Sequence, residues 1–186
     1  MHGEHLEEPF IKINPEHTVP TLDDNGEIFW DSHAISTYLI DKYANDDSLY
    51  PKDLVLRARC NQRLFFNNGN LFQRFRSGNR CIFGGASELE QNSIDQINES
   101  YDILEKLLET DPFMVGEQLT VADICLSTTL ECLNRLVPMD DEARPNTIAW
   151  LNRVKETVPF YDEMNAEYVD EFDGIIKAIM KKNQNN

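Results

Sequence analysis

The sequence HTVPTLDDNGEIFWDSHAISTYL, residues 17–39, decides how the first part of this chain folds. Two short apolar segments, Val19–Leu22 and Glu27–Trp30, flank the four residues Asp23-Asp24-Asn25-Gly26. An Asn-Gly pair suits the positive φ angles of a tight turn between antiparallel strands. The stretch therefore predicts a β-hairpin.

A helix is predicted directly after the hairpin. The pair Asp31-Ser32 is of a type that caps helix starts, and the apolar residues that follow have the spacing of an amphipathic helix: Ala34, Ile35, Tyr38 and Leu39. We expect this helix to end near residue 43 or 44. Residues 45–53 are polar and include Pro51, so we interpret them as a linker.

The predicted hairpin has no partner strand in the sequence. A two-stranded hairpin is marginally stable in water and needs further strands or a packed helix, so we expect the rest of its sheet to lie outside this chain. Pro20 stands at a strand start, where its missing N–H is tolerated at an edge, and an X-Pro bond can adopt the cis form. The backbone beside Pro20 would then leave hydrogen-bonding groups for a ligand.

The remainder of the chain carries helical patterns. Apolar residues within Glu88–Glu109 recur at spacings of three and four, and Thr120-Val121-Ala122-Asp123 nearly matches the capping box of a helix start. We assign Thr120 and Asp123 to folding rather than to chemistry. Further helices are expected over Arg57–Arg76, with a bend at Gly69, over the segment from Pro145 to Pro159, and over Tyr168–Met180, before a polar tail at 181–186.

Composition excludes several classes of protein. Asp and Glu outnumber Lys and Arg by 33 to 17 in 186 residues, and the formal charge of -16 repels nucleic acid and anionic lipid. There is neither an apolar run of membrane-spanning length nor the pattern of a signal peptide, so a cytoplasmic location is expected. The four cysteines lack metal-ligand spacing and are interpreted as reduced core thiols: Cys60, Cys81, Cys125 and Cys132.

Four ordered motifs resemble those of cytosolic glutathione transferases. They are His17-Thr18-Val19-Pro20-Thr21-Leu22, Asp31-Ser32-His33-Ala34-Ile35, Leu49-Tyr50-Pro51 and Leu119-Thr120-Val121-Ala122-Asp123. Gly3-Glu4-His5-Leu6 and the residues from Asn14 to Pro20 look most like the insect delta/epsilon class. The resemblance implies an α+β fold, mostly α. An incomplete thioredoxin-like glutathione-binding domain (residues 1–44) and a linker (45–53) precede an all-α helical-bundle domain (54–186).

The resemblance also implies a glutathione site. In the family the residue before a cis-proline pairs its main chain with the cysteinyl unit of glutathione, and Val19 and Pro20 match these positions. Ser32 and free N–H groups at the helix start suit the γ-glutamyl carboxylate, while Asp31 suits the ammonium group. His5 and His17 match positions that hold the glycyl carboxylate. Without a family context, Asp31-Ser32 would be a plain helix cap, His17 a surface residue, and His33 is assigned to structure.

A hydrophobic co-substrate pocket is implied at Phe72, Phe75, Arg76 and Phe83, which by family analogy lies between the domains. For any single one of these phenylalanines, core packing is the competing explanation. Arg76 could neutralise negative charge on glutathione or in the reaction, and a salt bridge or a solvated helix face explains it equally well. Apolar pockets with few polar groups accept varied compounds.

One feature departs from the family pattern. The Ser or Tyr that hydrogen-bonds the glutathione sulfur in the family would lie before Met1, in a strand-helix-strand unit that we expect to precede this chain. No catalytic residue is therefore predicted here, and reduced activity is expected because the thiolate is the attacking species. The first hypothesis is a homodimeric glutathione transferase that conjugates glutathione, without a metal, to hydrophobic electrophiles. The alternative is a non-catalytic binding or interaction protein, and a thiol-disulfide enzyme is disfavoured.

Overall fold

The computed structural model describes residues 3–185 and divides into two compact units, Met1–Pro51 and Lys52–Asn186. The first unit holds a two-stranded sheet with short helices, and the second is helical, with one isolated bridge between Phe113 and Gly116. The predicted fold class, α+β and mostly α, is confirmed. None of the described helices is both long enough and apolar enough to cross a membrane.

The first unit is built around the predicted hairpin. Strand β1 (Thr21–Asp24) pairs antiparallel with β2 (Glu27–Trp30), with Thr21 opposite Trp30 and Asp24 opposite Glu27. Asn25 and Gly26 have φ angles of 58° and 93°, as the Asn-Gly turn requires. Pairing begins at Thr21 rather than at Val19, because the preceding residue is a proline and cannot donate to a ladder.

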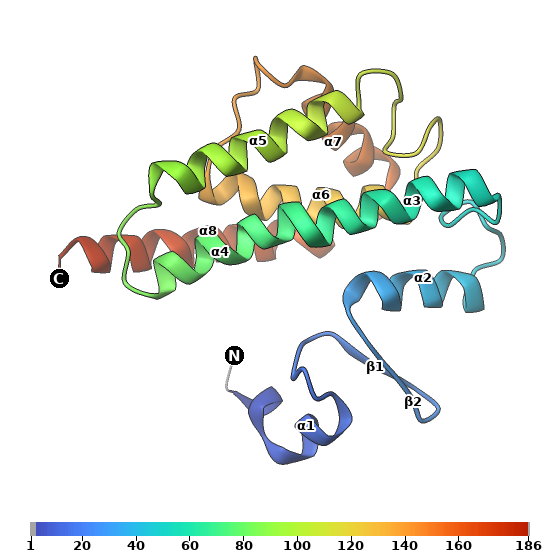
Figure 1. The fold of residues 1–186 in the computed structure, drawn as a ribbon, viewed down its shortest axis with the longest axis horizontal. Coiled ribbons are helices and arrows are strands. Elements are labelled where there is room, and N and C mark those ends of the chain that lie inside the picture. Colours follow the sequence, from blue (N-terminus) through green and yellow to red (C-terminus); the bar gives the residue numbers. More distant parts are fainter. Residues whose placement is uncertain (1–2, 186) are drawn as a thin grey trace. The chain divides into compact units, whose positions relative to one another are not determined.

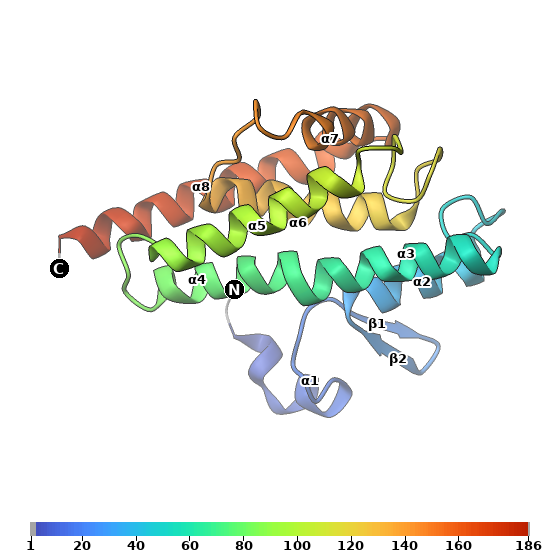
Figure 2. The same cartoon turned by 45° about the horizontal axis from the view of Figure 1, so that its top comes forward.

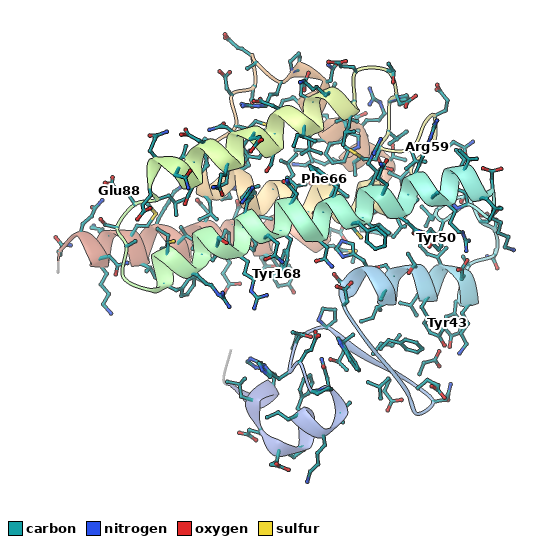
Figure 3. All side chains as sticks on the ribbon, viewed as in Figure 1. Tyr43, Tyr50, Arg59, Phe66, Glu88 and Tyr168 are labelled. Atoms are coloured by element: carbon teal, nitrogen blue, oxygen red, sulfur yellow. The ribbon has the colours of Figure 1, made fainter. Side chains whose placement is uncertain are left out.

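Three short helical elements complete this unit. The 3₁₀ turn η1 (Glu4–Leu6) and helix α1 (Glu8–Ile13) precede the hairpin and are not predicted from the sequence. Helix α2 (Ser32–Tyr43) follows it and ends where the pattern predicts. Side chains near the C-terminal end of α2 converge on the hairpin, where Oδ2 of Asp24 accepts from Tyr38, Lys42 and Tyr43 at 2.7, 2.6 and 2.7 Å (Figure 3).

The second unit opens with a long helical rod. Helix α3 (Leu54–Phe66), the π-helical segment η2 (Asn67–Leu71) and helix α4 (Phe72–Phe83) follow one another without a break (Figure 1). The helix predicted over 57–76 therefore starts earlier and ends later. Its start moves because Oδ1 of Asp53 caps it, accepting from the amides of Val55 and Leu56 at 3.0 and 2.9 Å. Gly69 lies inside the π-helical segment.

Four further helices complete this unit (Figure 2): α5 (Gln91–Leu107), α6 (Val121–Leu136), α7 (Pro145–Thr157) and α8 (Tyr161–Gln184). Helices α5, α6 and α8 contact the rod, and α7 packs on these three helices. Helix α6 contacts α3, α4, α7 and α8, and its residues Leu126, Leu130 and Leu133 are fully buried. The stripe predicted for α5 is buried at Ile97, Tyr101 and Leu104. Helix α8 is longer than the predicted 168–180 and includes most of the expected polar tail.

The predicted capping box is present at the start of α6. Asp123 is fully buried, and its carboxylate accepts from Thr120, from the amide of Met114 at 2.7 Å and from the Trp150 ring nitrogen at 2.8 Å. Burial raises the pKa of Asp123, although these hydrogen bonds lower it. One carboxylate thus joins α6, α7 and the loop before α6, in agreement with its assignment to folding.

All four cysteines are free thiols. Cys60 is buried and Cys125 and Cys132 are half-buried, but Cys81 is exposed, so the expectation of core thiols is wrong for Cys81. This residue lies near the end of α4, beside the buried Ile82, on the side of the helix that faces away from the core. Burial raises the pKa of the Cys60 and Cys132 thiols, which keeps both protonated at neutral pH.

Candidate functional site

The bond between Val19 and Pro20 is cis, as the sequence allows. Val19 is 69% exposed, and its backbone N–H and C=O make no hydrogen bond with any residue that the structure describes. The residue stands immediately before the edge of the hairpin. It therefore offers one donor and one acceptor to an extended peptide-like ligand, in the manner of an added strand.

The loop that carries Val19 is closed by Asn14, for which no role was predicted. Asn14 is fully buried, and its side-chain nitrogen donates to the carbonyl and hydroxyl of Thr18 at 3.1 Å each and to the Thr21 hydroxyl at 2.9 Å. Its oxygen accepts from the amide of Glu16 at 2.9 Å. This one amide fixes both ends of the loop, so the side chain of Asn14 positions Val19.

Two histidines from separate segments lie near each other in the same unit. The ring centroids of His5, on η1, and His17, on the loop, are 6.5 Å apart. His17 has a φ of 45°, a conformation that a residue other than glycine adopts at a cost. Each imidazole can donate to an anion from a ring nitrogen. The structure thus brings together the two residues predicted to hold one carboxylate.

The start of α2 agrees only in part with its predicted role. Asp31, at φ 69°, caps the helix, and its Oδ1 accepts from the amides of His33 and Ala34 at 2.9 and 3.2 Å. The expected set of free N–H groups is therefore reduced, because the cap occupies two of them. Ser32 is exposed, and neither its hydroxyl nor its N–H bonds another residue within 3–185.

His33 fits its structural assignment. Its Nδ1 lies 3.5 Å from Oδ1 of Asp31, and the side chain is largely buried. Burial lowers the pKa of His33 by more than the neighbouring Asp31 raises it. The imidazole is thus neutral at pH 7, and Ser32 remains the polar group at this helix start that faces solvent with no partner among the described residues.

In the second unit, an aromatic cluster joins α4 to α8. The ring of Phe75 lies 6.0 Å from that of Phe72 and 5.3 Å from that of Phe172. Tyr168, labelled in Figure 3, precedes Phe172 by one turn of α8 and is 67% exposed. Phe83 lies two turns further along α4 than Phe75, outside this cluster. Phe172 and Tyr168 were not predicted, although both fall on the helix expected over 168–180.

Comparison with known proteins decides the family. Models described as the N-terminal and C-terminal domains of glutathione S-transferase match residues 1–47 and 74–157. Glutathione S-transferase 1 of Manduca sexta is 42% identical over 168 residues, which cover 89% of this chain and 76% of that protein. The chain belongs to the glutathione S-transferase family.

Solved glutathione S-transferase structures give the same result. An epsilon-class glutathione S-transferase from the housefly, Musca domestica, superposes with a TM-score of 0.89 at 41% identity, covering 94% of this chain and 81% of that one. A glutathione transferase homologue of Drosophila mojavensis, solved with bound glutathione, superposes with a TM-score of 0.88 at 39% identity, covering 94% and 80%. The predicted resemblance to the insect delta/epsilon class is confirmed.

The residues predicted for this glutathione S-transferase fall into two sets. The proposed glutathione contacts lie in the first unit, and the proposed pocket residues lie in the second. Among residues 3–185, no group of three or more His, Cys, Asp or Glu side chains is arranged to hold a metal ion. The expectation about a unit before Met1 concerns residues outside this chain and stays a prediction.

Proposed function

We propose that this protein conjugates glutathione to electrophilic, mostly hydrophobic compounds. The observation that carries the proposal is the exposed backbone of Val19, which precedes the hairpin edge and has no hydrogen-bond partner among the described residues, in a member of the glutathione S-transferase family. An open backbone edge of this kind suits the peptide part of glutathione, and the homologue from D. mojavensis was solved with glutathione bound.

We assign each part of glutathione to residues that complement its charge or its hydrogen-bonding groups. Val19 pairs with the cysteinyl unit, and Pro20 fixes its direction. Ser32 donates its hydroxyl and N–H to the γ-glutamyl carboxylate at the helix start, where the helix dipole favours negative charge. Asp31 attracts the ammonium group, and His5 and His17 donate to the glycyl carboxylate. Two of these residues, His17 and Asp31, are held at positive φ, and such strained conformations cluster at functional sites.

The electrophile is assigned to the apolar surface of α4. Phe72, Phe75 and Phe83 supply aromatic contact area, and Arg76 supplies a positive charge for the negative charge that develops in the reaction. In the reaction the glutathione thiolate forms a bond from sulfur to carbon, and the leaving group, for example chloride from an aryl chloride, departs with its electron pair. No residue of this chain is predicted to hold the sulfur.

Isothermal titration of the protein with glutathione tests the assignment. Ser32→Ala should raise the dissociation constant about tenfold, because it removes a hydrogen bond to a carboxylate worth about 1.5 kcal/mol. Ser36→Ala, one turn further along α2, is the matched control and should leave the constant within about twofold. Equal constants for Ser32→Ala and the wild type would overturn the assignment of Ser32. A folded wild-type protein that binds no glutathione would favour the non-catalytic alternative.

Assembly, location and domain bounds are proposed on the same basis. We propose a cytoplasmic homodimer that contacts its partner through the α3–α4 rod, where Phe65 is 74% exposed. The domain bounds remain 1–44 and 54–186 with a linker at 45–53. Light scattering would give a mass near twice that of the 21.5 kDa chain for the dimer, and Phe65→Glu should shift it to the monomer.

A further inference from the structure

One segment of this acidic chain carries only positive charge. Residues 54–87 contain no Asp or Glu, although the whole sequence has 33 acidic residues and a formal charge of -16. The same segment contains six arginines, at positions 57, 59, 63, 74, 76 and 80. The rod from α3 to α4 is therefore a strongly basic element within an acidic protein.

These six arginines differ in their contacts, and two neighbours on α4 are among those that are exposed. Arg63 donates to the carbonyl of Met114, and Arg74 donates to Gln96 at 2.6 Å, so both serve packing. Arg76 and Arg80 are exposed, and neither guanidinium makes an ion pair or hydrogen bond with any residue in 3–185. Their two charges have no neutralising partner within the described chain.

The aromatic residues of α4 share a face with these charges. Phe72, Arg76, Arg80 and Phe83 are spaced by four, four and three residues, which places all four along one stripe of the helix. All four are exposed, with Phe72 at 39% and Phe83 at 61%. The stripe is thus positive in its middle and aromatic at both ends, and Phe72 continues into the cluster with Phe75.

Salt screening explains why the charges of the stripe affect a bound ligand more than the net charge of the whole chain does. At physiological ionic strength the screening length is about 8 Å, so distant carboxylates are largely screened at the stripe. Two guanidinium groups one helical turn apart lie within that length of a ligand that contacts both. An uncharged apolar ligand would gain nothing from the arginines and would have to desolvate them. An anion with an aromatic body gains from both parts of the stripe.

We infer that this face of α4 selects small aromatic compounds that carry a negative charge, such as aromatic carboxylates or sulfonates. The inference rests on the proposed function for its meaning, since it names the class of electrophile that the transferase would prefer. Binding of the anion itself does not need glutathione. Arg76 and Arg80 would pair with the acidic group, while Phe72 and Phe83 contact the rings.

A matched pair of fluorescent probes tests the selection on the full chain. The probes are 8-anilinonaphthalene-1-sulfonate and N-phenyl-1-naphthylamine, which have the same rings with and without the sulfonate. We expect the variant Arg76→Gln/Arg80→Gln to weaken binding of the sulfonate about tenfold, since each exposed ion pair contributes modestly. Binding of the uncharged probe should stay within about twofold.

The control variant is Arg59→Gln/Lys106→Gln. It removes the same charge, and Arg59, labelled in Figure 3, stands 17 residues before Arg76, about 25 Å along the rod. This variant should bind both probes as the wild type does. If the two variants lose sulfonate binding equally, the loss comes from the change in net charge rather than from the stripe. This outcome would overturn the inference.

Two further outcomes overturn it. Unchanged sulfonate binding in Arg76→Gln/Arg80→Gln would do so directly. A change of molecular mass by light scattering, with the probe constants unchanged, would mean that a second copy of the chain covers the stripe.

Turnover then separates this inference from the proposed function. In the Arg76→Gln/Arg80→Gln variant we expect kcat/KM for 4-chloro-3,5-dinitrobenzoate to fall about tenfold more than kcat/KM for uncharged 1-chloro-2,4-dinitrobenzene, because both compounds lose the charge of Arg76 in the reaction but only the benzoate also loses its ion pairs. Equal losses for both compounds would contradict charge selection. If neither compound is conjugated while sulfonate binding still depends on both arginines, the proposed function fails and the anion site stands.

Discussion

At the scale of single residues, Asn14 holds the loop that carries Val19. Its amide makes four hydrogen bonds while it is fully buried, and together they hold the loop from Glu16 to Thr21 closed. A buried amide that keeps all its partners stabilises one loop conformation, whereas one that loses partners is costly. The conformation of Val19 therefore depends on a side chain five residues away.

Asn14→Asp tests this dependence with little change of shape. The carboxylate cannot donate, and it would face the carbonyl of Thr18, which now accepts from Asn14. We expect a loss of about 2–3 kcal/mol in unfolding free energy of the first unit and at least a tenfold rise in the glutathione dissociation constant. Calorimetry and urea unfolding measure both.

The control is Asn25→Asp at the exposed hairpin tip, the same chemical change in a turn that tolerates Asp. It should leave glutathione binding unchanged. Wild-type affinity in a folded Asn14→Asp protein would show that Asn14 does not position the loop.

Single residues differed in how far the sequence could predict them. Val19, Pro20, Asp31 and Ser32 stand in motifs of fixed spacing, so their positions were predictable. Asn14 stands in the same stretch as Val19 and Pro20, yet its role follows from burial by a closed loop, which local sequence does not encode. The Asp31 cap was predictable as well, but not that it would occupy two of the N–H groups expected for a ligand.

At the scale of elements, the α3–α4 rod offers a contrast between two glycines. A Cβ added at Gly69, in the π-helical segment, would have no heavy atom within 4 Å, whereas one at Gly78 would lie 3.2 Å from Leu136 and 3.6 Å from Leu89. Alanine favours a helix over glycine by about 0.8–1 kcal/mol. At Gly78 this gain is opposed by a tight contact with the side chain of Leu136.

We therefore expect Gly69→Ala to raise the unfolding free energy by about 0.5–1 kcal/mol. Gly78→Ala should leave it at or below the wild-type value, since α6 must shift to accept the methyl group. Urea unfolding followed by circular dichroism compares the two variants. Equal stabilisation by both would mean that α4 and α6 pack more loosely at Gly78 than the structure indicates.

Helix α5 holds the start of α7 through one carboxylate. Glu105 accepts from the amide and side chain of Asn146 at 3.0 and 2.6 Å and from those of Thr147 at 2.9 and 2.8 Å. Burial raises the pKa of Glu105, but the four hydrogen bonds together lower it by a larger amount. The pKa of Glu105 therefore lies below its ordinary value of 4.5. The ionised form is therefore favoured in the folded state.

This depressed pKa gives stability a predictable pH dependence. The contribution is complete above about pH 4.5, the unfolded value, and is lost as the pH falls through the lower folded value. Glu105→Gln should cost about 1 kcal/mol at pH 7, discounted for partial exposure, and this difference should shrink toward pH 3. Glu109→Gln, one turn further along, serves as the control. A difference that grows as the pH falls would contradict the assigned hydrogen bonds.

Helix boundaries were the least predictable feature of the elements. Helix α1 has six residues, too few for a periodic signal, and Ile11 and Ile13 on it are exposed. Helix α8 continues past Met180 because the side chain of Asn183 donates to the carbonyls of Ile82 and Ala86 at 2.9 and 2.8 Å. Such a tertiary contact keeps a polar segment helical, and the pattern of the segment alone gives no sign of it.

At the scale of the whole molecule, sequence predicted the order of parts better than their details. The hairpin turn, the α2 cap and the α6 capping box are local, and each formed as its residues dictate. The π-helical segment between α3 and α4 was not predictable, because it depends on how the rod packs against other helices. The chain thus combines a small unit built around a hairpin with a large helical unit, and the proposed glutathione contacts belong to the small one.

The central claim is that glutathione binds along Val19 and at the start of α2. The most direct measurement is a titration of ¹⁵N-labelled protein with glutathione, followed by amide chemical shifts. We predict saturable shifts at the amides of Val19 and Ser32, with amides of α7 unchanged as the internal reference. A folded protein whose Val19 and Ser32 amides do not move at saturating glutathione, or whose shifts are confined to the second unit, would contradict the account.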